Sequence, residues 1–67
     1  MPKRTPTLAQ QIKAARKAAG LSQHKLGLAI GTTGQTVWTW EDGRQLPSAA
    51  WLQKLAEILG VSFTIGD

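Results

Sequence analysis

The chain has 67 residues, no cysteine and a formal net charge of +4, which indicates one small basic domain without disulfides or thiolate metal sites. Its apolar runs are too short to span a bilayer and no signal-peptide pattern precedes them, so we expect a cytoplasmic protein with no membrane partner. Residues 1–20 carry five cations and no acid, which indicates either a polyanionic partner such as nucleic acid or a solvated, solubilising surface.

Four helices are predicted after an N-terminal arm, residues 1–6, which holds two prolines and two cations and should form no regular element. We predict them over residues 7–19, 22–30, 33–41 and 48–59. The first begins at a capping box, because Thr7 is followed three positions later by Gln10. The other three begin at or next to hydroxyl residues that suit a helix N-cap: Ser22, Thr33 and Ser48.

The second and third predicted helices meet at a tight corner. Apolar residues at helical spacing mark the facing sides of the two helices: Leu26 and Ile30, then Val37 and Trp40. Gly31 between them can adopt the left-handed conformation that ends a helix. At Gly27 a large side chain would force the helices apart, so a residue without one suits a close crossing. This register predicts a helix-turn-helix.

Several short motifs occur along the chain in a fixed order and spacing. They are GLSQ at 20–23, L-G-x-x-I-G at 26–31, V-W-x-W-E-D-G at 37–43, P-S at 47–48 and L-x-x-L-A-x-x-L-G-V-S at 52–62. In these motifs the chain resembles the XRE-type helix-turn-helix family of phage repressors and Cro proteins. The resemblance covers about residues 8–62. It implies a mostly α, compact, lambda-repressor-like four-helix domain over residues 7–60 that binds double-stranded DNA.

The resemblance places base readout on the exposed N-terminal part of the third helix, at Gly34, Gln35 and Thr39, with Trp38 flanking them. The amide of Gln35 can pair with adenine N6 and N7, and Thr39 can donate, accept, or contact a thymine methyl. Gly34 departs from the family, which typically has a polar side chain there. It either permits close backbone approach or removes one contact.

Trp38 and Trp40 lie about 160° apart in the helical projection, so one small core cannot bury both. Trp40 matches the buried position of the family. An exposed Trp38 indole would pack on sugar and phosphate, donate its N–H, or touch a second subunit.

Phosphate contacts are expected from polar and basic residues around that helix. In the resemblance Gln23 bonds phosphate and supports the third helix. Arg44, in the loop after the third helix, is expected to hold a phosphate on the other side. The complete set of expected phosphate contacts is Ser22, Gln23, Thr33, Arg44, Lys3 and Arg4. The resemblance also implies a structural ion pair between Arg16 and Glu41.

The last segment, residues 61–67, is predicted to form a C-terminal strand, because residues 61–65 alternate apolar and polar side chains with the period of a β-strand, where the family usually begins a further helix. This ending weakly resembles HipB-like antitoxins, which combine the fold with such a strand. The predicted fourth helix is also apolar over about half its circumference, more than one small core needs. We therefore expect a homodimer joined by paired C-terminal strands. The alternatives are a fifth short helix or an ordered tail in a monomer. The expected interface residues are Trp51, Ile58, Val61, Phe63 and Ile65.

The leading functional hypothesis is a sequence-specific transcriptional regulator, a repressor that binds a palindromic operator as a dimer. The alternative is an antitoxin that binds a toxin protein and autoregulates its operon. A toxin-sized product of the adjacent reading frame that co-purifies would favour the second. His24 has no cysteine or acid at metal spacing around it, so we expect no metal, no cofactor and no enzymatic activity.

Overall fold

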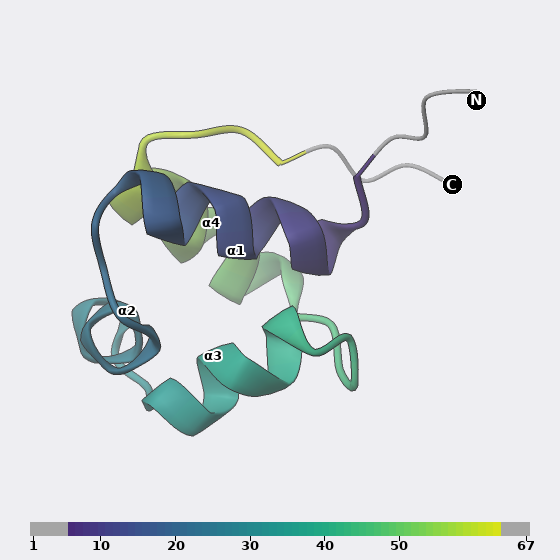
Figure 1. The fold of residues 1–67 in the computed structure, drawn as a ribbon, viewed down its shortest axis with the longest axis horizontal. Helices are drawn as coiled ribbons and strands as arrows, with labels where there is room; N and C mark the ends of the chain where they lie inside the picture. The colour runs from purple at the N-terminus through teal and green to yellow at the C-terminus, as the bar shows by residue number, and fades with distance from the viewer. Residues whose placement is uncertain (1–5, 64–67) are drawn as a thin grey trace.

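The computed structural model describes residues 6–63 and folds them into four α-helices (Figure 1). They are α1 (Leu8–Ala18), α2 (Gln23–Ile30), α3 (Gly34–Glu41) and α4 (Ala49–Leu59). The mostly α, four-helix repressor-like fold predicted from the sequence is confirmed. No helix within residues 6–63 is long and apolar enough to cross a membrane.

Each helix begins at a hydroxyl side chain that accepts a hydrogen bond from a backbone N–H of the first turn. At α1 the bond is reciprocal: Thr7 Oγ1 accepts from the Gln10 backbone over 3.2 Å, and Gln10 Oε1 accepts from the Thr7 backbone over 2.9 Å. This is the capping box expected from the sequence. The caps of the later helices are Ser22, Thr33 and Ser48.

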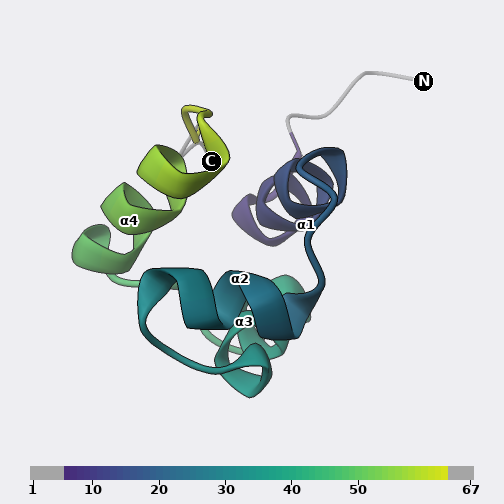
Figure 2. The ribbon, with the colours of Figure 1, turned by 90° about the vertical axis from the view of Figure 1, so that its left-hand side faces the viewer.

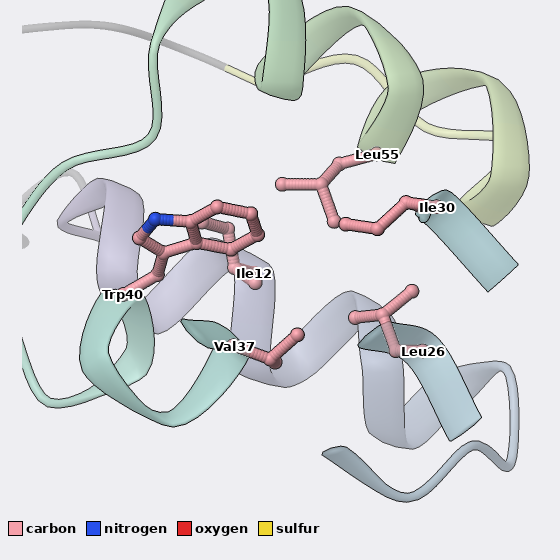
Figure 3. Packing of buried hydrophobic residues seen from close by; sticks show 6 residues of the cluster. All are labelled: Ile12, Leu26, Ile30, Val37, Trp40 and Leu55. Atoms are coloured by element: carbon pink, nitrogen blue, oxygen red, sulfur yellow. The ribbon is translucent and has the colours of Figure 1, made fainter. Parts of the chain in front are cut away.

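The helices surround one small core to which all four contribute (Figure 3). Its fully packed side chains are Ile12, Leu26, Ile30, Val37, Trp40 and Leu55. Burying one such side chain is worth roughly 1.5–3 kcal/mol. Four of the six come from α2 and α3, so the corner predicted from the sequence also forms most of the core.

The two helices of that corner pack closely at Gly27, and Figure 2 shows α2 in front of α3, with α1 and α4 above them. A Cβ at Gly27 would lie 2.4 Å from the carbonyl carbon of Thr33, which is backbone and cannot move aside. Gly31, at φ 93°, then reverses the chain into α3. The close crossing predicted at Gly27 is therefore present.

The chain after α4 runs back over the molecule (Figure 1). Residues 61–63 form no strand, and the rest of the predicted strand lies outside the described residues, as do Lys3, Arg4 and Ile65. Phe63 is half-buried against its own core. It lines two grooves, one beside α1 and one beside α4. Part of the apolar surface of α4 is thus covered from within the chain.

Candidate nucleic-acid interface

The exposed face of α3 carries three of the side chains that the sequence assigns to base contacts. Gln35 is exposed, and its carboxamide makes no hydrogen bond to another described residue. Trp38 is 38% exposed, whereas Trp40 is 3% exposed in the core. Thr39 is half-buried, and its Oγ1 donates to the Gln35 carbonyl over 2.9 Å. The hydroxyl hydrogen of Thr39 is therefore engaged, which leaves its methyl group and an acceptor lone pair for a ligand.

Gly34 packs against α2. A Cβ at Gly34 would stand 2.9 Å from Cα of His24 and 3.0 Å from its nitrogen. These are backbone atoms, so a side chain would push the first turn of α3 away from α2. The glycine thus permits close packing of two helices of the same chain, a reason that sequence reasoning did not supply.

Gln23 links the start of α2 to the end of α3. Its Nε2 donates to Oε1 of Glu41 over 3.2 Å. Gln23 also lines an open cleft together with His24, Gln35 and Trp38. One amide hydrogen of Gln23 supports α3, and the second remains available to an anion.

The carboxylate of Glu41 also binds Arg16 from α1. Arg16 Nε donates to Oε2 of Glu41 over 2.6 Å, and Nη2 donates to Oε1 over 3.0 Å. Arg16 Nη1 donates to the carbonyl of Leu21 over 2.9 Å. The two side chains are only 11% and 3% exposed. The hydrogen bond to Glu41, aided by its charge, raises the pKa of Arg16 against the opposing effect of burial.

Arg44 folds back over the end of α3. Gly43 takes a left-handed conformation, φ 81°, and the Arg44 N–H donates to the carbonyl of Thr39 over 3.2 Å. Its Nε donates to Oδ2 of Asp42 over 2.7 Å, and its guanidinium carbon lies 5.4 Å from the centroid of the Trp38 ring. Arg44 and Trp38 therefore form one surface.

Lys13 of α1 is a cation on this surface that the sequence did not assign. It lines a small polar cleft with Gln23, Trp38 and Asp42, and it forms no ion pair within the described residues. Lys13 could have been identified from the sequence by its position three residues before Arg16, because residues three apart lie on the same side of a helix.

The other expected site residues lie on two separate parts of the surface. Ser22 and Thr33 cap α2 and α3; as a cap acceptor, the Ser22 hydroxyl keeps its hydrogen for a ligand.

Trp51, an expected interface residue, packs on Trp40 with ring centroids 5.8 Å apart, so it has a partner in its own chain. The remaining expected interface positions, Ile58 and Val61, are 48% and 38% exposed.

A family model described as a helix-turn-helix domain matches residues 7–64. The chain belongs to this helix-turn-helix family. The XRE-type resemblance predicted from the sequence is confirmed by this match and by the solved structures that resemble the domain. No curated protein matches the chain.

Two solved structures resemble this helix-turn-helix protein over most of both chains. The P22 c2 repressor, in complex with synthetic operator 9T, is 28% identical with a TM-score of 0.81, over 87% of this chain and 88% of the repressor chain in that structure. HipB, in its O1-O2 complex, is 26% identical with a TM-score of 0.69, over 100% of this chain and 99% of the HipB chain in that structure.

A third similar structure is hydroxypropylphosphonic acid epoxidase from S. wedmorenis, at 30% identity and a TM-score of 0.72. The match covers 82% of this chain but only 29% of the epoxidase. The likeness is thus confined to less than a third of a longer enzyme chain.

Proposed function

We propose that this protein is a sequence-specific regulator that binds double-stranded DNA and acts as a repressor. The observation that carries the proposal is that α3 is held in place by its neighbours while its outer face stays accessible. Glu41 at the end of α3 accepts hydrogen bonds from α1 and α2, and the outer face carries Gln35 and Thr39. A helix held in this way, with the free carboxamide of Gln35 on its outer face, fits the major groove of B-DNA. The similarity to the P22 c2 repressor, solved in complex with a synthetic operator, supports the proposal.

Base readout belongs to Gln35 and Thr39. The free carboxamide of Gln35 donates to N7 and accepts from N6 of adenine. Thr39 accepts from a base amino group or places its methyl against a thymine methyl, because its hydroxyl hydrogen is bonded within α3.

Phosphate contacts flank these readers and set the position of the helix without reading sequence. Gln23 offers its second amide hydrogen, and Ser22 and Thr33 stand at helix N-termini, where backbone N–H groups favour anions. Arg44 contributes a cation at the other end of α3, and Lys13 contributes one from α1. Lys3 and Arg4 of the arm complete the proposed set.

The regulator acts in the cytoplasm as a homodimer on a palindromic operator, and it represses by covering a promoter. The exposed apolar side chains of Ile58 and Val61 support a contact between two copies at this end of the molecule. A two-fold axis there makes the interface self-complementary and places two α3 helices on two half-sites.

The second candidate function is that of an antitoxin which binds a toxin protein and autoregulates its operon. The match to HipB favours it, because the match spans all of this chain and 99% of HipB. Co-expression with the product of the adjacent reading frame separates the two functions. An antitoxin forms a stable complex with that product, whereas a simple repressor does not.

The test of the proposed function is selection of bound fragments from random duplex DNA, followed by titration of the selected duplex and of a scrambled control. We expect a single two-fold symmetric consensus and a dissociation constant at least about 10³-fold lower for the selected duplex. A pool that shows no enrichment after repeated rounds would contradict sequence-specific binding.

A further inference from the structure

Arg44 is held on several sides although its side chain is 68% exposed. The backbone of Arg44 is fixed by its hydrogen bond to Thr39, and its Nε by the short bond to Asp42. The third support is aromatic, since the guanidinium lies over the Trp38 ring. A solvent-exposed arginine without such contacts samples many rotamers, all but one of which would be lost on binding a ligand.

These contacts leave the outer edge of the guanidinium open. Asp42 is bonded through Nε, and neither Nη1 nor Nη2 of Arg44 donates a hydrogen bond within the described residues. Two adjacent Nη groups with free hydrogens match the oxygens of a phosphate in a bidentate geometry.

Trp38 lies near both this arginine and Gln23, another of the proposed phosphate contacts. It lines two clefts that contain Gln23, one of which also contains Gln35, and its ring supports the Arg44 guanidinium. A cation over an indole face is attracted by the negative face of the ring, and the indole is the strongest such partner among side chains.

We propose that Trp38 is a positioning residue that holds the Arg44 guanidinium ready for a DNA phosphate, and that it reads no base. This inference rests on the proposed DNA-binding function and assigns Trp38 a role within it. Trp38 acts through Arg44, so its contribution to affinity disappears when Arg44 is absent.

A double-mutant cycle tests the inference with the full chain and the selected duplex. Trp38→Leu should weaken binding roughly 2–5-fold, the range expected for an exposed cation–π contact, and Trp38→Phe should restore part of the loss. In the Arg44→Ala background, Trp38→Leu should cause no further loss. Losses that multiply, or a selected consensus altered by Trp38→Leu alone, would overturn the inference.

Proton NMR of the free protein gives a second readout that does not depend on DNA. The δ protons of Arg44 should be shifted upfield by the Trp38 ring, the shift should persist in Trp38→Phe, and it should vanish in Trp38→Leu. Unchanged Arg44 resonances in Trp38→Leu would overturn the inference. Thermal melting of each variant establishes that it is folded.

Lys54 provides the matched control, because its Nζ lies 5.0 Å from the ring centroid of Trp51 on α4. Lys54→Ala removes the same charge from a similar cation–π pair within α4, outside the proposed phosphate contacts, and it should leave the salt dependence of binding unchanged. Arg44→Ala should reduce the slope of log K against log salt by about 0.9. Absence of duplex binding by the wild type would overturn the proposed function together with the inference, whereas binding with independent losses overturns the inference alone.

Discussion

Arg16 and Glu41, 25 residues apart, form a two-point ion pair that joins the third turn of α1 to the last residue of α3. The same carboxylate accepts the amide of Gln23 at the start of α2. One carboxylate thus fixes the end of α3 against both helices that precede it. Since α3 is the proposed recognition helix, this link connects the stability of the fold to the geometry of the DNA-binding surface.

Glu41→Ala should lower the free energy of unfolding by roughly 3–5 kcal/mol, because it leaves the buried charge of Arg16 without its partner. Urea denaturation measures the change. Glu57→Ala, at an exposed position on α4, is the control and should alter stability by less than about 0.5 kcal/mol. A loss within about 1 kcal/mol for Glu41→Ala would mean that the pair behaves as a surface ion pair.

The raised pKa of Arg16 sets how this pair behaves at high pH. Because folding raises that pKa, the stability contributed by Arg16 is fully present below its unfolded pKa and is lost only as the pH rises through the folded pKa. Titration of Arg16 should therefore cause no measurable change in the free energy of unfolding between about pH 6 and pH 9. Urea denaturation of the wild type and of Arg16→Lys across this range gives the comparison.

Gly34→Ala should destabilise the fold by roughly 1–3 kcal/mol and weaken duplex binding, because the new Cβ would lie 2.9 Å from Cα of His24. Gly27→Ala should cost more, since its Cβ would come within 2.4 Å of the Thr33 backbone. Gly20→Ala is the control: nothing lies within 4 Å, so only the strain at φ 73° is introduced, about 1–2 kcal/mol. The control should bind DNA normally. A Gly34→Ala protein as stable as the wild type would show that α2 and α3 separate easily.

The sequence was sufficient to predict the helix-turn-helix because its signals are local. Leu26 and Ile30 repeat at helical spacing, the hydroxyl caps mark the helix starts, and Gly27 marks the crossing. The ion pair of Arg16 and Glu41 came from the resemblance, since spacing alone does not relate residues so far apart.

The remaining features depend on distances that no local pattern encodes. The packing role of Gly34 follows from how near His24 lies, and the stacking of Arg44 on Trp38 follows from the turn at Gly43. Phe63 belongs to a segment that alternates like a strand, yet it packs on its own core. Alternation reports which side chains are apolar, but it does not report which surface covers them.

The dimer proposal is tested by removing an exposed apolar contact without touching the core. Ile58→Asp should convert a sedimenting dimer to monomer and weaken operator binding, because Ile58 is 48% exposed on α4. Leu46→Asp is the control, because Leu46 is 70% exposed in the loop before α4. The Leu46→Asp protein should remain dimeric. Deleting residues 61–67 should also abolish dimerisation, although this change also removes the packing of Phe63 on the core. A wild-type protein that sediments as a monomer at the concentrations at which it binds DNA would contradict the proposal.

The central claim, that α3 reads base edges while its neighbours hold phosphate, is tested most directly by comparing consensus sequences selected by the wild type, Gln35→Ala and Arg44→Ala. We expect Gln35→Ala to lose preference at about one base pair in each half-site, a loss of roughly 1–3 kcal/mol of discrimination. Arg44→Ala should weaken binding to all sequences alike and leave the consensus intact. A consensus unchanged by Gln35→Ala would contradict the account.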